Sequence, residues 1–518
     1  MKIGSRNGVH SPYIALSVVC FGLIIVVLDN SILNIAIPAL SRDLGASTSD
    51  LQWIIDAYTL VYAGIMLTAG ALGDRFGRRR SLFWGVAGFG AASALASLAD
   101  TTVMLTIARG LMGAFGAFMT PASLSIVTNL FHEPKERARA IGFWAAASSL
   151  GVVIGPVVGG LLLAHFWWGS VFLVNVPIAI GLLIALPIFV PESKNPEEAS
   201  LDPLGAVLSI VAMTALLWAT IAGPDHGWTS APVLGGFALG LLGVVVFVWW
   251  ESTCANPMFD VGFFKIAGFS AATMANMAMV MAWAGTSFVF VQLLQSVLGF
   301  SPLRAGIGLT PVAVVAAIGG LASTPLAARF GRRIVIACGL AAQAIGAALF
   351  LTYQLSGGYW VAITYLIVFS AGQSLVFTQC VASAMDSVPR ERSGVASGAN
   401  NTMRQAGVAF GIAITGSIMS SSYRSHLAAA GDSLNLPADL VAKAGRSIAS
   451  AVATAQDVGG TTGATLLGAA KDSFVPAFHT AMLAGLIFCV LGIIVAVIWI
   501  PEKPIHADAA PATAEPLH

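Results

Sequence analysis

The chain alternates between long apolar segments and short polar turns, and most of its charges lie in those turns. An apolar helix of about 20 residues crosses the hydrocarbon core of a bilayer, where its backbone must satisfy its own hydrogen bonds. The segments lack the period-two alternation of membrane barrel strands. The pattern predicts an all-α polytopic membrane protein with about 14 transmembrane helices, at roughly 12–37, 51–71, 82–99, 102–130, 138–164, 171–190, 203–222, 232–250, 267–295, 303–327, 334–354, 359–384, 395–420 and 477–500.

Composition excludes a soluble globular chain. Hydrophobic residues make up 57% of the sequence and charged residues only 9%, with a mean hydropathy of +0.85, whereas soluble domains carry roughly 25% charged residues. The five cysteines are scattered without disulfide or metal-site spacing. The first apolar segment lacks a small-residue cleavage site, so we expect a retained helix rather than a signal peptide.

Basic residues mark one side of the predicted membrane. If each turn takes the number of the predicted span before it, basic residues concentrate in the even-numbered turns. The short odd-numbered turns hold few basic residues beyond Arg42 and Arg304. Basic turns stay on the cytoplasmic side. We therefore expect both termini to be cytoplasmic, together with the turns that contain Arg75, Arg78, Arg79 and Arg80; Lys135, Arg137 and Arg139; Arg329, Arg332 and Arg333; and Arg390 and Arg392.

One basic turn occurs twice. Gly70–Arg80 returns in weakened form at Thr324–Arg333, and its arginines Arg75 and Arg329 lie 254 positions apart. Duplicated halves are typical of secondary transporters, but this offset corresponds to about eight spans rather than six. We therefore predict two six-helix bundles, at 12–190 and 267–500, separated by a linker and two inserted helices at 191–266.

The second bundle is expected to contain a long external loop at 421–476, with a surface amphipathic helix from about Pro437 to Gln456. Residues 501–518 are rich in alanine and proline and form the predicted cytoplasmic tail.

Three charged residues stand out well inside the predicted spans of the first bundle: Asp29, Asp56 and Arg109. A charge at the centre of a membrane helix costs about 2.5–3.5 kcal/mol. At about 1.5 Å per residue, all three lie at a similar depth, so we expect them to be near one another. Asp29 and Arg109 could form a structural pair that joins two helices. Alternatively, a carboxylate whose surroundings change could exchange a proton and couple transport to proton entry.

Two glycine-containing motifs have structural and functional interpretations. The first comprises Gly151, Gly155, Pro156, Gly159 and Gly160. Glycines four apart allow close helix packing, which alone would explain the spacing. The added proline favours a deformable hinge against a neighbouring helix.

The second motif is the basic turn with Gly70, Asp74, Arg75, Gly77, Arg78 and Arg79. Its arginines suit anionic lipid headgroups. Asp74 suits them less well, and it could instead bind a facing helix N-terminus or a basic side chain as a gate that breaks when the inner side opens. The second copy has Ala328 at the corresponding position.

Other candidate residues concern the ligand and the energy source. Trp53, Tyr58, Phe115 and Trp144 could form aromatic walls for a cationic ligand. The chain has no GxxxxGK[ST] phosphate loop, so we expect a proton gradient as the energy source and no cofactor.

No group of nucleophile, base or metal ligands converges in the sequence, so we expect no enzyme activity. The predicted partners are small amphipathic molecules, protons and membrane lipid, without nucleic acid or an obligate protein partner.

These motifs together resemble those of the major facilitator superfamily, and in particular its fourteen-span drug:H⁺ antiporter branch. Gly70–Arg80 is similar to the superfamily's signature turn, and Gly151–Gly160 to the motif associated with antiporters. Leu28–Pro38, which contains Asp29 and Asn34, resembles the branch's first-span motif; Leu51–Tyr58 and Trp168–Pro177 also resemble this branch. The resemblance implies the major facilitator fold, a bacterial inner-membrane location and proton-coupled drug export.

The match has two departures. Met112 stands in the motif around Arg109 where the family usually has Gln, and the thirteenth span contains Arg404 rather than an acid. The acid at position 56 resembles exporters of quaternary ammonium compounds. We therefore expect efflux of amphipathic, cationic drugs or antiseptics, with Asp29 carrying the proton, Arg109 tuning it, and Asp56, Trp53, Tyr58 and Asn34 recognising the ligand. The roles of the two aspartates could be exchanged. The alternatives are a dedicated exporter of one neutral or anionic metabolite or antibiotic, and a membrane-bound sensor or structural protein that no longer transports.

Overall fold

The computed structural model describes residues 12–131, 133–194, 202–254, 257, 259–388 and 393–500. Over these residues the chain is helical and contains no strand. The predicted tail 501–518, most of the polar linker, and Arg390 and Arg392 lie outside the described residues.

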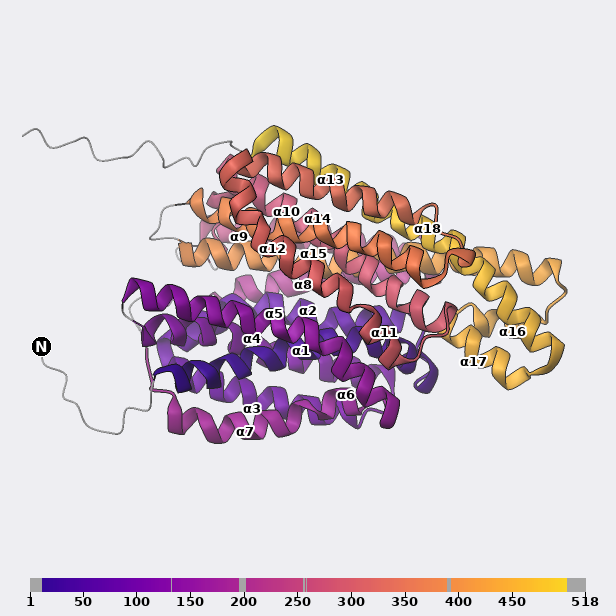
Figure 1. The fold of residues 1–518 in the computed structure, drawn as a ribbon, viewed down its shortest axis with the longest axis horizontal. Helices are drawn as coiled ribbons and strands as arrows, with labels where there is room; N and C mark the ends of the chain where they lie inside the picture. The colour runs from indigo at the N-terminus through magenta and orange to yellow at the C-terminus, as the bar shows by residue number, and fades with distance from the viewer. Residues whose placement is uncertain are drawn as a thin grey trace, which may run out of the picture.

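The helices form two layers with one helix between them (Figure 1). One layer consists of α1 (Pro12–Asp43), α2 (Thr48–Phe76), α3 (Arg78–Ser97), α4 (Thr102–Leu130), α5 (Pro134–His165), α6 (Ser170–Leu173) and α7 (Asn175–Phe189). Then come α8 (Pro203–His226), α9 (Ala231–Thr253) and the short η1 (Val261–Lys265). The other layer consists of α10 (Ala267–Gln292), η2 (Leu293–Val297), α11 (Pro302–Gly308), α12 (Thr310–Phe330), α13 (Arg332–Phe350), η3 (Leu355–Gly357), α14 (Gly358–Asp386), α15 (Ser393–Ser433), α16 (Ala438–Ala444), α17 (Ile448–Val458) and α18 (Gly460–Trp499).

The all-α membrane fold predicted from the apolar segments is confirmed. In the described part of the chain, ten helices are long and apolar enough to cross a membrane, or eleven if Thr48–Met66 and Thr68–Phe76 count as one span. Each of the fourteen predicted segments is also largely helical, although 171–190, 267–295 and 303–327 are each divided between two consecutive helices. The count of fourteen spans stays a prediction.

Local sequence explains where several helices begin. Ser47 caps α2 through a reciprocal capping box with Asp50, which satisfies backbone groups that a helix start leaves free. Gly77 separates α2 from α3 with φ of 120°, and Gly331 separates α12 from α13 with φ of 87°. Glycine adopts such positive φ values at little cost. The two copies of the basic turn therefore make the same kind of sharp helix–helix connection.

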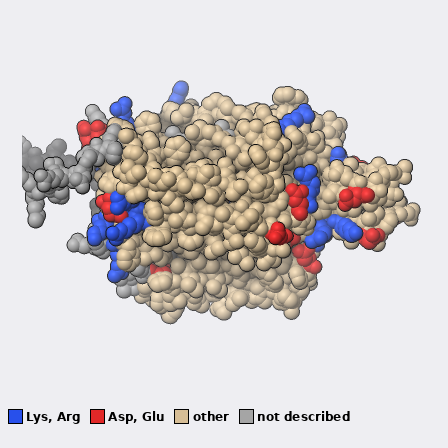
Figure 2. Space-filling model, turned by 90° about the horizontal axis from the view of Figure 1, so that it is seen from below, with Lys and Arg blue, Asp and Glu red and all other residues tan. Residues whose placement is uncertain are grey.

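The two turns define one end of the molecule, which we call the basic end; α16 and α17 define the opposite cap end (Figure 1). Figure 2 shows charged side chains gathered at these two ends of one face, with a wide band free of charge between them. Exposed apolar side chains, such as Leu241, Val245 and Trp249 on α9, cover the outside. A surface of this kind suits a bilayer.

Helix α8 lies in the seam between the two layers. It packs against α9, against α2 of the first layer and against α15 of the second. Ile210 of α8 fills the space beside Gly64 of α2, and the Ser417 hydroxyl of α15 donates to the backbone oxygen of Thr220 at 2.9 Å. Asp225, near the end of α8, accepts from Ser49 of α2 at 2.8 Å and pairs with Arg424 of α15 at 2.5 Å. The first of the two predicted inserted helices thus touches both layers.

The segment 421–476, predicted as a long external loop, is largely helical, and its place outside the membrane stays a prediction. Helix α15 continues to Ser433, α18 already begins at Gly460, and two short helices lie between them. The predicted surface helix from Pro437 to about Gln456 corresponds to α16 and α17, which are interrupted at Gly445–Ser447. Alanine dominates this region, and alanine has the highest helix propensity.

Candidate functional site

Asp29 and Arg109 meet in the interior of the first layer. The Asp29 side chain, on α1, is 1% exposed, and Arg109, on α4, is fully buried. The Nη1 of Arg109 donates to Asp29 Oδ2 at 2.5 Å, and Asn175 of α7 donates to Asp29 Oδ1 at 2.9 Å. Asn175 also lies 3.4 Å from the hydroxyl of Ser93 on α3. Both carboxylate oxygens are therefore satisfied by side chains of the same layer.

Helix α2 supplies the other neighbours of Arg109. The Nε of Arg109 donates to the backbone oxygen of Ile54 at 3.1 Å, and its guanidinium lies over the Tyr58 ring, 4.4 Å from the centroid. Tyr58 is 2% exposed and stacks on Tyr62 with centroids 5.8 Å apart. In this conformation Tyr58, predicted as a ligand wall, instead helps to hold Arg109 by a cation–π contact.

Asp56 lies apart from this network, although the sequence predicted it at the same depth. Its side chain is fully buried, and neither carboxylate oxygen has a hydrogen-bond partner among the described residues. Ile54 and Tyr58, which face Arg109, lie two residues before and after Asp56, so they are on a different face of the helix. Asp56 instead shares a face with Gln52, one turn earlier.

That face of α2 meets the second layer. The Nε2 of Gln52 donates to the backbone oxygens of Ile412 and Ala413 of α15, at 3.1 and 2.8 Å. Trp53 packs in a cluster with side chains of α8 and α15, including Leu217 and Ala409. Asp56 is thus a buried, unpartnered carboxylate on the helix face that lines the seam.

The remaining predicted recognition residue on α1 is Asn34. It is half-buried, and its side-chain amide donates to the backbone oxygen of Asn30 on the same helix at 3.1 Å. Across the seam, Arg404 of α15 donates through Nε and Nη2 to Asn401 Oδ1, at 3.0 and 2.7 Å. In the described chain, no carboxylate pairs with Arg404.

The glycine motif of α5 forms two contact surfaces. A Cβ at Gly151, Gly155 or Gly159 would meet α1, and at Gly155 it would lie 2.3 Å from Ser31 Cβ. A Cβ at Gly160 would lie 2.6 Å from Leu303 Cα of α11. The backbone of Pro156 likewise lies against Gly306 of α11. Helix α5 is therefore packed closely against its own layer on one side and against the second layer on the other.

The basic turn is held within the first layer. Asp74 Oδ1 accepts from Arg78 Nε at 2.6 Å, so the predicted gate carboxylate pairs with an arginine of its own motif. Gly70 packs near Pro121 of α4. Arg75 lies over the Phe76 ring. The gating role of Asp74 stays a prediction.

Cross-layer hydrogen bonds close the seam at the cap end. The hydroxyls of Ser41 and Ser447 are 2.6 Å apart, and the backbone nitrogen of Thr48 donates to the oxygen of Arg446 at 3.1 Å. Gln295 donates to the oxygen of Ile35 at 2.9 Å. The segment between α16 and α17 is therefore bonded to the end of α1 and to the start of α2.

Sequence reasoning assigned no role to Asn175, Gln52, Asp225 or Arg424. Asn175 and Gln52 lie inside segments that carry the family resemblance. As polar residues in apolar spans, they could have been identified as candidates for buried hydrogen bonds. Asp225 and Arg424 lie just beyond the predicted spans 203–222 and 395–420, and nothing in the sequence indicated that they meet.

Comparison with known proteins identifies the family to which the chain belongs. The sequence profile of the Major Facilitator Superfamily matches residues 19–412. The chain is 36% identical to the "Multidrug efflux pump LfrA" of Mycolicibacterium smegmatis, covering 91% of this chain and 93% of that protein. It is 33% identical to the "Methyl viologen resistance protein SmvA" of Salmonella typhimurium (91% and 94%), and 31% identical to the "Tetracenomycin C resistance and export protein" of Streptomyces glaucescens (92% and 88%).

Solved structures agree on the fold. A bacterial homologue of the human lysosomal transporter Spinster, in an inward-facing and unoccupied conformation, aligns with a TM-score of 0.67 at 17% identity, covering 95% of this chain and 98% of that chain. A D-xylose–proton symporter aligns with a TM-score of 0.62 at 16% identity, covering 95% and 98%.

Proposed function

Because this chain belongs to the major facilitator superfamily, and is therefore a transporter rather than an enzyme, we propose that it exports amphipathic, cationic molecules in exchange for protons. The two layers would rock about the seam so that it opens alternately to either side. The proton gradient would supply the energy without a cofactor. The protein is a multi-pass membrane protein, and the basic turns favour cytoplasmic termini in a bacterial inner membrane.

The single observation that carries this proposal is the buried carboxylate of Asp56 in the seam, which has no hydrogen-bond partner among the residues that the structure describes. An unpaired ion in such surroundings is costly unless it is neutralised. A proton or a cationic ligand can each neutralise it, but both cannot do so at once. Competition for one carboxylate therefore provides exchange: the arriving proton releases the cation, and the arriving cation releases the proton.

The Asp29–Arg109 pair supports a different role in the same cycle. Asp29 is already neutralised by an arginine and an amide of its own layer. We assign the pair to positioning α1 and α4, and through the Ile54 and Tyr58 contacts also α2, on which Asp56 lies. Of the two assignments that the sequence left open, this geometry favours Asp56 as the exchange site.

The test uses everted membrane vesicles from an efflux-deficient host, with ethidium transport and proton counter-flow recorded together. Asp56→Asn should abolish both, because the amide cannot exchange a proton, whereas Asp56→Glu should retain part of each. Asp43→Asn is the matched control, since Asp43 is an exposed acid on α1. Ethidium-driven proton release at the wild-type rate in correctly inserted Asp56→Asn protein would refute the proposal.

A dedicated exporter of one neutral or anionic compound is the second candidate. Arg404, a cation on the helix that lines the seam, favours it, and one relative is named for a single antibiotic. A toxicity panel of lipophilic cations, neutral drugs and acidic drugs separates the two. Protection against one neutral or acidic compound, with none against ethidium or benzalkonium, would select this candidate.

A further inference from the structure

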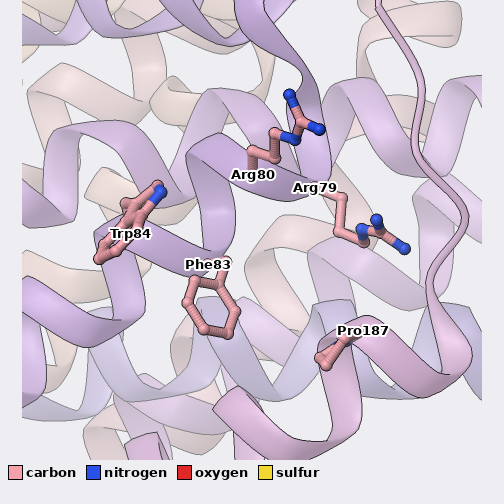
Figure 3. Close-up of a pocket in the computed structure, with 5 residues that line it drawn as sticks. All are labelled: Arg79, Arg80, Phe83, Trp84 and Pro187. Atoms are coloured by element: carbon pink, nitrogen blue, oxygen red, sulfur yellow. The ribbon is translucent and has the colours of Figure 1, made fainter.

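A small recess lies at the basic end, between the start of α3 and the end of α7. Its lining consists of Arg79, Arg80, Phe83, Trp84 and Pro187. Figure 3 shows the two guanidinium groups at one edge of the recess and the rings of Phe83 and Trp84 along the other. Cationic and aromatic side chains thus share one recess that the transport cycle described above does not use.

The surroundings of the recess are those of a lipid-facing surface. Trp84 is 68% exposed. On α7, Ile180, Ile184 and Ile188 are exposed at successive turns, and Pro187 lies beside the last of them. Tryptophan is enriched where lipid headgroups meet acyl chains. The apolar stripe therefore ends at the arginines, where a headgroup would lie.

The arginines keep positive charge available. Arg78 is paired with Asp74, whereas among the described residues Arg79 and Arg80 share one carboxylate, that of Glu192, at 3.7 and 3.8 Å. Charge-assisted bonds at full strength are about 2.7–2.9 Å long, so this contact is loose. The Arg80 side chain is 73% exposed. One carboxylate between two guanidinium groups leaves a net positive site.

The second copy of the turn lacks this chemistry. The repeat offset of 254 places Arg333, Ile334, Ala337 and Cys338 at the positions of Arg79, Arg80, Phe83 and Trp84. One arginine and both aromatic rings are replaced. Both copies keep arginines that suit general anchoring at the membrane, whereas the combination of paired arginines and aromatic rings occurs only in the first copy.

We propose that this recess binds one anionic phospholipid of the leaflet at the basic end. The lipid phosphate lies between Arg79 and Arg80 in place of Glu192, and an acyl chain follows Trp84 and the isoleucine stripe of α7. Glu192 also accepts a hydrogen bond from the Arg79 backbone nitrogen at 3.0 Å. The lipid therefore competes with the contact between α3 and the segment that follows α7.

The experiment titrates the purified, delipidated full-length protein with phosphatidylglycerol or phosphatidylcholine of identical acyl chains, and counts bound lipids by native mass spectrometry. We expect one phosphatidylglycerol to bind at concentrations where phosphatidylcholine does not. Arg79→Gln/Arg80→Gln should weaken phosphatidylglycerol binding about thirtyfold, since each of the two arginines near an anionic lipid contributes about 1 kcal/mol. Glu192→Gln should strengthen it, because it removes the competing carboxylate.

The matched control is Arg329→Gln/Arg333→Gln, which removes the same charge from the second copy and should leave binding within about twofold. Equal weakening by both double variants would indicate diffuse attraction and overturn the proposal, as would unchanged binding in Arg79→Gln/Arg80→Gln. Displacement of the lipid by sodium phosphate, but not by sodium chloride of equal ionic strength, would reassign the site to free phosphate. The readout does not depend on transport, so failure of the proposed function leaves it intact.

Discussion

The interior of the first layer and the seam between the layers hold their buried charges in opposite ways. In the interior, Asp29 of α1 is satisfied by Arg109 of α4 and Asn175 of α7, all in one layer. In the seam, Asp56 is equally buried but has no hydrogen-bond partner in the described part of the chain. A satisfied network keeps its helices together during a cycle. An unsatisfied carboxylate at a moving boundary has free energy to gain from a proton or a ligand.

The largest effect is expected inside the first layer. Arg109→Gln leaves Asp29 without its cation in a dry interior, which costs about 3–5 kcal/mol. We expect little folded protein and no transport, measured by yield and by thermal unfolding in detergent. The double variant Asp29→Asn/Arg109→Gln removes both charges and should recover most of the stability. If the double variant is less stable than Arg109→Gln alone, the pair does not hold this layer together.

The contact of α5 with α1 should tolerate no added volume. In Gly155→Val the new side chain would clash with Ser31, and overpacking of this kind costs about 1–3 kcal/mol. Gly142→Ala is the control on the same helix, because nothing lies within 4 Å of a Cβ there. Thermal unfolding should separate the two, with a lower midpoint only for Gly155→Val. Equal midpoints would mean that α5 and α1 are not closely packed.

Asp56→Asn should separate stability from transport. Since the carboxylate has no hydrogen-bond partner to lose within the described ranges, we expect thermal stability to change by less than about 1 kcal/mol or to increase. Asp29→Asn should be clearly destabilised, because it leaves Arg109 unpaired. The comparison fails if Asp56→Asn unfolds as readily as Asp29→Asn.

The smallest effect is expected at the cap end of the seam, where Asp225 of α8 bridges Ser49 and Arg424. Partly exposed ion pairs contribute about 0.2–1 kcal/mol, enough to shift an opening equilibrium without unfolding the protein. Asp225→Asn should speed hydrogen exchange at the start of α2 and the end of α15. Asp439→Asn, an exposed acid on α16, is the control. Unchanged exchange in Asp225→Asn would show that this bridge does not restrain the cap end.

Much of this arrangement was predictable from particular residues. The estimated depth of each residue in the membrane predicted that Asp29 lies near Arg109, and the structure shows the contact. The same argument predicted that Asp56 lies nearby, but depth in the membrane does not specify which face of α2 the residue occupies. Residues 54 and 58 of α2 face Arg109, whereas 52 and 56 face the seam, because two residues correspond to more than half a helical turn. The family resemblance is confirmed by the sequence profile and by relatives across most of the chain.

Other features could not be read from the sequence. The alanine-rich segment 421–476 looked like a loop because it lacks an apolar run, yet its helices continue beyond the apolar region. The links from Asp225 to Ser49 and Arg424 join residues about 176 and 199 positions apart, and no local pattern indicates such pairs.

By itself the sequence determined the class of protein, the repeat and which acids lie inside membrane spans. Exposing a long apolar segment to water and burying a charge in the bilayer both cost much free energy, so few alternatives remain. Only the tertiary structure decided which acid is neutralised and which faces the seam, and that α8 lies in that seam. Those outcomes depend on how whole helices rotate and pack against one another, and many packings of similar energy are compatible with one apolar pattern.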